Sequence, residues 1–123
     1  MAALVIDDSK AMRAMLRRIL GSAGLEVFEA GDGQEALDCL RRIDGITLAL
    51  VDWNMPGMDG YQFIRTVRAN PAYVHLRLMM VTAESEVDQI TEALAAGADE
   101  YIMKPFTRDA VLDKLKLLGI TPN

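Results

Sequence analysis

Short apolar segments alternate along this chain with segments in which apolar residues recur every three or four positions. The short segments have the length and composition of β-strands, and the others have the periodicity of amphipathic helices. The expected strands are residues 2–6, 27–30, 46–51, 78–81 and 101–103, and the expected helices include residues 12–20, 36–43, 63–67, 90–94 and 111–118. This order predicts an α/β fold with a parallel sheet, because each helix returns the chain to the edge where the previous strand began.

The strands differ in their polar neighbours, and this predicts their places in the sheet. The first, third and fourth are almost wholly apolar, as strands buried on both faces are. Glu26 and Glu29 flank the second strand, and Asp99 and Glu100 precede the fifth, so these two are expected at the edges. We therefore expect a doubly wound, flavodoxin-like (βα)5 fold whose five-stranded parallel sheet has the order 2-1-3-4-5. Ligands of such sheets bind beyond the carboxyl ends of the strands, here between strands one and three.

Composition narrows the classes of function. The chain has 123 residues without a linker, repeat or low-complexity tract, so we expect residues 1–123 to form a single domain with no output domain. Its formal net charge of -5 argues against a nucleic-acid partner. A lone cysteine, Cys39, and the lack of a signal peptide or a long apolar span predict a cytoplasmic protein with no membrane partner. We expect this protein to be a monomer.

Polar residues stand where four of the expected strands end. Asp7 and Asp8 follow the first strand, Asp52 the third, Thr82 the fourth and Lys104 the fifth. The carboxyl ends of parallel strands lie at the same edge of a sheet, so these five side chains are expected to converge.

Their combined chemistry points to phosphoryl transfer. Three clustered carboxylates raise one another's pKa unless a cation intervenes, and their hard oxygen atoms suit Mg²⁺. A metal ion, an ammonium and a hydroxyl around one carboxylate can hold the three oxygens of a phosphoryl group, which makes Asp52 the expected nucleophile. Simpler interpretations exist for single members: Asp7, Asp8 and Ser9 as a helix N-terminus, and Lys104 as a structural ion pair.

Four segments, IDDS, VDWNMPGMDG, MMVTAE and YIMKPF, lie between residues 6 and 106. They resemble the defining segments of the bacterial response-regulator receiver domain, and most of all its single-domain chemotaxis type. The resemblance implies that Asp52 takes a phosphoryl group from the phosphohistidine of a histidine kinase or phosphotransfer domain. It also implies a Mg²⁺ site made by Asp8, Asp52 and the Asn54 backbone carbonyl, with Asp7 acting through a metal-bound water. Such a protein is a signalling switch that catalyses its own phosphorylation and dephosphorylation, and is not a conventional enzyme.

The same resemblance implies a switch. Lys104 would contact a phosphoryl oxygen, and the Lys104–Pro105 peptide bond would be cis. Thr82 would move toward the phosphoryl group, and Tyr101 would rotate inward, changing the surface of the fourth helix, fifth strand and fifth helix for a protein target. A simpler interpretation of Tyr101 is an edge-strand aromatic that is half-buried for packing alone.

The resemblance also bears on lifetime and pathway. Asn54 and Glu84, each two residues beyond Asp52 and Thr82, would set the lifetime of the phosphoryl group, which we expect to be seconds to minutes. The target would be the flagellar motor switch or another protein. Residues 84–88 are acidic where the chemotaxis regulators carry lysines, which weakens the inference of motor binding. A phosphorelay intermediate or a phosphate sink therefore stays open.

Two other classes fit less well. Phosphatases of the haloacid-dehalogenase type also use a strand-terminal aspartate with Mg²⁺. They place a general acid two residues after it, where this chain has Asn54, and their acidic metal ligands come late in the chain. A flavin-binding module can share the strand order, but Asp7 and Asp8 would repel its phosphate, and no glycine-rich phosphate loop is present.

Overall fold

The computed structural model describes residues 1–83 and 88–120, in which strands and helices alternate as the sequence predicts. The strands are β1 (Ala2–Ile6), β2 (Glu26–Ala30), β3 (Ile46–Asp52), β4 (Arg77–Ala83) and β5 (Glu100–Lys104). All neighbouring pairs are parallel, and the order is β2-β1-β3-β4-β5. The expected fold class and strand order are therefore confirmed, with β2 and β5 at the edges.

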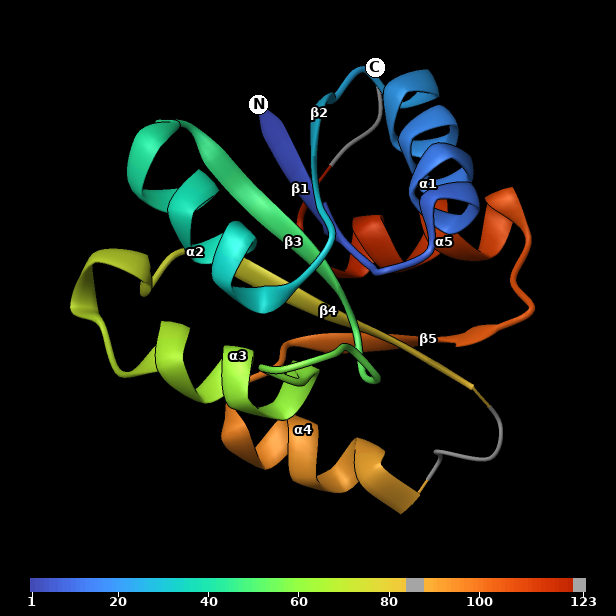
Figure 1. The fold of residues 1–123 in the computed structure, drawn as a ribbon. Helices are drawn as coiled ribbons and strands as arrows, with labels where there is room; N and C mark the ends of the chain where they lie inside the picture. The colour runs from blue at the N-terminus through green and yellow to red at the C-terminus, as the bar shows by residue number, and fades with distance from the viewer. Residues whose placement is uncertain (84–87, 121–123) are drawn as a thin grey trace.

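Helices cover both faces of the sheet (Figure 1). They are α1 (Lys10–Ser22), α2 (Gly33–Arg42), α3 (Gly60–Arg68), α4 (Ile90–Ala96) and α5 (Arg108–Leu117), and a short 3-10 helix, η1 (Pro71–Tyr73), precedes β4. In Figure 1, α1 and α5 lie on one face and α2, α3 and α4 on the other. No helix in the described ranges is long and apolar enough to cross a membrane.

The central strands separate two hydrophobic cores. Successive residues of a strand point to opposite faces, so the side chains of β1 divide between the two layers. Leu4 and Ile6 pack with the residues of α2 and α3, whereas Ala3 and Val5 pack with those of α1 and α5. These strands are buried on both sides, which explains why their sequences are continuous apolar runs instead of alternating ones.

Side-chain caps begin several helices close to the carboxyl edge of the sheet. The capping oxygens accept hydrogen bonds from backbone N–H groups in the first turn and belong to Ser9, Asp32, Asp59 and Thr107. An N-terminal cap of this kind satisfies a backbone donor that has no partner within the helix. The loops at this edge are therefore tied directly to the helices that follow them.

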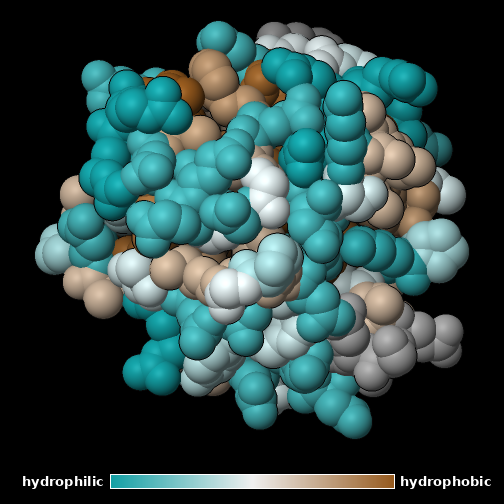
Figure 2. All heavy atoms as spheres, viewed as in Figure 1, coloured by the Kyte–Doolittle hydropathy of each residue, from teal (hydrophilic) through white to brown (hydrophobic). Residues whose placement is uncertain are grey.

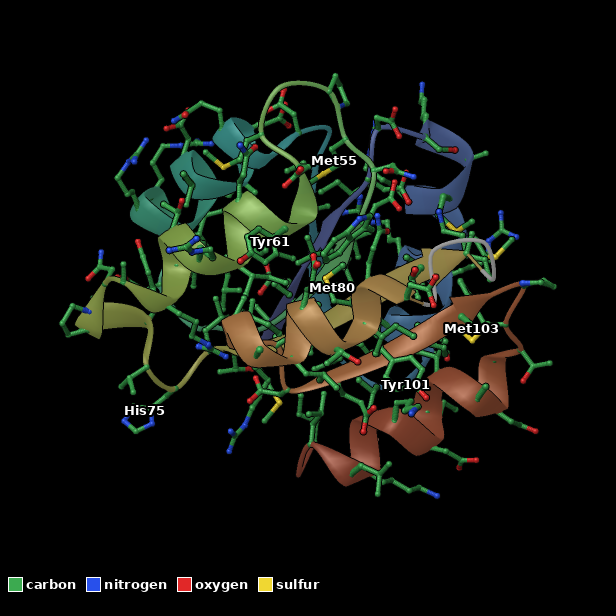
Figure 3. All side chains as sticks on the ribbon, turned by 90° about the horizontal axis from the view of Figure 1, so that it is seen from below. Met55, Tyr61, His75, Met80, Tyr101 and Met103 are labelled. Atoms are coloured by element: carbon green, nitrogen blue, oxygen red, sulfur yellow. The ribbon has the colours of Figure 1, made fainter. Side chains whose placement is uncertain are left out.

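Several other residues have structural places. Cys39 is buried within α2, and Met79 and Met80 fill opposite cores. His75 is exposed in the loop between η1 and β4, far from Tyr101 and Met103 (Figure 3). Polar side chains predominate on the face of the molecule shown in Figure 2.

Candidate functional site

Three carboxylates meet beyond the carboxyl ends of β1 and β3. Asp7 and Asp8 follow β1 directly, and Asp52 is the last residue of β3. Each offers one oxygen atom within 4.8 Å of the other two, so the group can hold a metal ion. Asp7 and Asp52 are buried, whereas Asp8 is exposed. The site is therefore closed to solvent around Asp7 and Asp52 and open to solvent at Asp8.

Lys104, at the end of β5, extends its ammonium to this group. Its Nζ lies 3.3 Å from Asp52 Oδ1 and 3.8 Å from Asp7 Oδ2. The shorter contact is a hydrogen bond that Lys104 donates. The Lys104–Pro105 peptide bond is cis.

The turn after β1 is held by hydrogen bonds on three sides. Asp7 N–H donates to the Ala30 carbonyl of β2 at 3.1 Å, and Asp7 Oδ1 accepts from Ser9 N–H at 2.8 Å. Arg13 Nη1 donates to the Asp7 carbonyl oxygen at 2.7 Å. Asp7 Oδ2 is buried and accepts no hydrogen bond from any residue that the structure describes. It faces the other acidic groups and Lys104, and is available to a cation.

Burial dominates the electrostatics of this site. The pKa of Asp52 is raised to about 6, chiefly by burial and next by the neighbouring Asp7 carboxylate, while Lys104 opposes both effects. The pKa of Asp7 is also raised, chiefly by burial, against the lowering effects of the Ser9 N–H and Lys104. Desolvation and like charge thus disfavour the ionised forms of two adjacent carboxyl groups, and a bound cation would relieve both.

The loop from β3 to α3 packs closely over Asp52. Trp53 N–H donates to the Val81 carbonyl, and Gly60 N–H donates to the Trp53 carbonyl at 3.0 Å. A Cβ atom on Gly60 would lie only 2.7 Å from the Asp52 carbonyl oxygen. Asn54 is exposed at the start of this loop, and the buried Met55 anchors it (Figure 3).

Thr82 and Tyr101 lie in β4, the neighbour of β3, and in the edge strand β5 beyond it. Thr82 is buried near the end of β4, where it is in register with Met103 of β5. Tyr101 is half-buried in β5 beside α5 (Figure 3), and Lys114 Nζ lies 4.5 Å from the centroid of its ring. Glu84 lies outside the described residues, as does most of the acidic segment 84–88.

The sequence did not predict the contacts of two charged groups around these positions, Arg13 and Glu100. Arg13 reaches the acidic turn and also Glu29 of β2, to which its Nε donates at 3.1 Å. Glu100 accepts from Lys114 at 2.9 Å and from Tyr101 N–H at 3.0 Å. Acidic residues in the edge strands and basic residues in the helices could have suggested such ion pairs. Sequence spacing alone does not say which acidic residue meets which basic one.

Comparison with known proteins agrees with this geometry. Residues 3–116 match the family model described as the response regulator receiver domain. The chemotaxis protein CheY of Pseudomonas aeruginosa is 40% identical over 117 residues, which cover 94% of each chain. CheY-3 of Vibrio cholerae is 40% identical over 116 residues, covering 94% of this chain and 88% of that protein.

Solved structures show the same likeness. The chemotaxis protein CheY4 of Vibrio cholerae superposes with a TM-score of 0.88 at 34% identity, covering 96% of this chain and 98% of that one. A putative response regulator from Chloroflexus aurantiacus gives a TM-score of 0.89 at 31% identity, covering 95% of each chain. The chain belongs to the response-regulator receiver-domain family, whose members serve two-component signalling.

Proposed function

We propose that the carboxylate of Asp52 accepts a phosphoryl group from a phosphohistidine of a histidine kinase or phosphotransfer domain. The observation that carries the proposal is the placement of this buried carboxylate beside two others and 3.3 Å from the Lys104 ammonium. An Asp52 oxygen would form a bond to phosphorus as the donor's P–N bond breaks, and the electron pair of that bond would return to the imidazole.

Mg²⁺ fits the donors around Asp52. Asp7, Asp8 and Asp52 supply hard carboxylate oxygens within 4.8 Å of one another, and Asn54 can supply its backbone carbonyl. The buried Asp7 Oδ2, which has no hydrogen-bond donor in the described structure, supports this assignment. Mg²⁺ prefers such oxygen ligands and keeps several waters. When bound, it would neutralise the negative charge that the carboxylates share with a phosphoryl group.

Lys104 and Thr82 would orient the transferred group. The Lys104 ammonium already lies beside Asp52 Oδ1, so it can contact a phosphoryl oxygen bonded to that carboxylate. The Thr82 hydroxyl would donate to another phosphoryl oxygen. Positively charged and hydroxyl donors at fixed places stabilise phosphoryl transfer mainly through electrostatics.

The phosphorylated site would act on partners through the surface of α4, β5 and α5. Thr82 would move toward the phosphoryl group and Tyr101 would turn inward, which changes this surface for a protein target. Asn54, exposed next to the site, and Glu84 would control the attack of water on the aspartyl phosphate. The protein would thus catalyse its own phosphorylation and dephosphorylation, as a switch.

A role in chemotaxis follows from the relatives. The chemotaxis proteins of Pseudomonas aeruginosa and Vibrio cholerae match almost the whole chain at 40% identity. We infer that this protein carries a signal of the same type, with a flagellar motor switch or another phosphorylation-dependent partner as its target. The acidic residues 84–88 favour a target other than the motor.

Phosphorylation with a small donor tests the assignment of Asp52. The protein is incubated with Mg²⁺ and acetyl phosphate, the adduct is detected by intact mass spectrometry, and beryllofluoride binding is followed by Trp53 fluorescence. Trp53 is buried next to Asp52, so its environment should change on modification. We expect the adduct and the fluorescence change in the wild type and not in Asp52→Asn.

Asp44→Asn is the matched control, because it makes the same chemical change at an exposed aspartate. It should behave as the wild type does. Equal modification of wild type and Asp52→Asn would refute the proposal. Steady release of phosphate from many simple phosphate esters would instead indicate a phosphatase.

A further inference from the structure

Arg13 connects the acidic turn to the edge strand β2. From the second turn of α1, its Nη1 donates to the Asp7 carbonyl at 2.7 Å and its Nε donates to Glu29 Oε1 at 3.1 Å. Both contacts use the rigid plane of one guanidinium, so the direction of one bond fixes the other. The Arg13 side chain is only 19% exposed, so water has limited access to compete for these hydrogen bonds.

The accepting carbonyl belongs to the peptide unit between Asp7 and Asp8. Rotation of this peptide unit would change the direction of both carboxylates at once. Ser9 N–H restrains the Asp7 side chain, and Ala30 restrains the Asp7 amide. Arg13 supplies the restraint on the Asp7 carbonyl.

Arg17 provides an internal comparison one helical turn further along α1. Its Nη1 also pairs with Glu29, through Oε2, and its Nη2 donates to the Val27 carbonyl at 2.9 Å. Arg17 therefore shares the Glu29 partner and the contact with β2. Within the described structure the Arg17 side chain donates its hydrogen bonds to β2, and none to Asp7 or Asp8.

We propose that Arg13 is a positioning residue that orients the Asp7–Asp8 turn for Mg²⁺ binding, with Glu29 holding its guanidinium in place. This inference rests on the proposed function, because it assumes that the three carboxylates bind Mg²⁺. Metal sites depend on outer contacts that orient their ligands, and losing such contacts weakens metal affinity. Arg13 acts here through a ligand's backbone and not through the metal.

The sign of the effect separates positioning from charge. Removing a positive charge near a cation site strengthens Mg²⁺ binding if only Coulomb repulsion is at work. Removing a restraint on the ligands weakens it. Arg13→Met removes both a positive charge and a restraint on the turn. Arg17→Met also removes a positive charge and an ion pair with Glu29, but it leaves the contacts of the Asp7–Asp8 turn intact.

Calorimetric titration with Mg²⁺ measures this difference directly. We expect the Mg²⁺ dissociation constant of Arg13→Met to rise about tenfold, the lower end of the effect of losing a contact that orients a metal ligand. Arg17→Met should bind as the wild type does or slightly tighter. Equal changes in the two variants, or tighter binding by Arg13→Met, would overturn the inference.

Arg13→Lys tests positioning at constant charge. Its single ammonium lacks the planar fork that contacts Asp7 and Glu29 together, so we expect weaker Mg²⁺ binding than in the wild type. Wild-type affinity in Arg13→Lys would refute the inference, and this variant decides the matter if Arg13→Met does not fold. Absence of Mg²⁺ binding in the wild type would instead refute the proposed metal site.

Discussion

Replacing Asp52 by asparagine should stabilise the metal-free protein at neutral pH. Asp52 is only 5% exposed, and burial together with the neighbouring Asp7 carboxylate raises the pKa of its side chain from 3.8 to about 6. The folded state therefore binds the proton of this carboxyl group more tightly than the unfolded state does. Above about pH 6 the group is ionised in both states, and the folded protein carries the full cost of its buried charge.

The magnitude follows from the pKa difference. A shift of about two pKa units at 1.36 kcal/mol each corresponds to about 3 kcal/mol of lost stability at pH 7.5. Asparagine removes the charge, but it also removes the partner that lies 3.3 Å from Lys104. We therefore expect Asp52→Asn to gain about 2 kcal/mol at neutral pH, which corresponds to a rise in Tm on the order of 10 °C.

The gain should depend on pH in a defined direction. As pH falls from about 6 to about 4, the folded carboxyl group takes up its proton before the unfolded one does, so the penalty disappears. Urea denaturation in EDTA at about pH 7.5 and about pH 4.5 measures the difference between variant and wild type. We expect the advantage of Asp52→Asn to fall below about 1 kcal/mol at the lower pH.

Asp44→Asn again serves as the control, because its carboxylate is exposed, and it should change the free energy of unfolding little at either pH. A lower stability of Asp52→Asn than of the wild type at neutral pH would contradict the reasoning. So would a gain of the same size at both pH values, because the effect would then not come from ionisation of Asp52.

Two further substitutions probe the surroundings of the site. Gly60→Ala should destabilise the protein by about 1–3 kcal/mol and slow phosphorylation, because the added Cβ would lie 2.7 Å from the Asp52 carbonyl oxygen. Urea denaturation measures the loss of stability, and the rate of phosphorylation by acetyl phosphate measures the second effect. Gly21→Ala in α1 is the control, because its Cβ would meet nothing within 4 Å, and it should be neutral or stabilising. Equal losses of stability in the two variants would argue against the close contact between Gly60 and the Asp52 carbonyl. Lys114→Met removes the ammonium over the Tyr101 ring, so the ring should leave its present position more easily and beryllofluoride should bind more tightly. Unchanged beryllofluoride affinity and an unchanged 19F NMR spectrum of fluorotyrosine-labelled protein would show that this contact does not restrain Tyr101.

The fold and the main members of the site could be predicted because both depend on local patterns. Apolar runs of strand length alternate with helical periodicity, and this order permits few topologies. Asp7, Asp52 and Lys104 stand directly after or at the end of such runs. Once the strands are parallel, these residues share one edge of the sheet, whatever the details of packing.

Contacts made by long side chains could not be predicted in the same way. Arg68 donates to the carbonyls of Gly97, Tyr73 and Leu76 and to the carboxylate of Asp99. The acceptors lie up to 31 positions away in the sequence. No periodicity relates them, because an arginine side chain has many rotamers and its partners are set by how the loops pack.

The sequence by itself determined the doubly wound sheet and the set of polar residues at its carboxyl edge. Only the tertiary structure decided that Asp7 and Asp52 are buried while Asp8 is exposed, and that Arg13 contacts the turn between the two acidic residues. The physical reason is range. Hydrophobic periodicity is a property of neighbouring residues, whereas burial, pKa shifts and guanidinium contacts depend on atoms that only folding brings together.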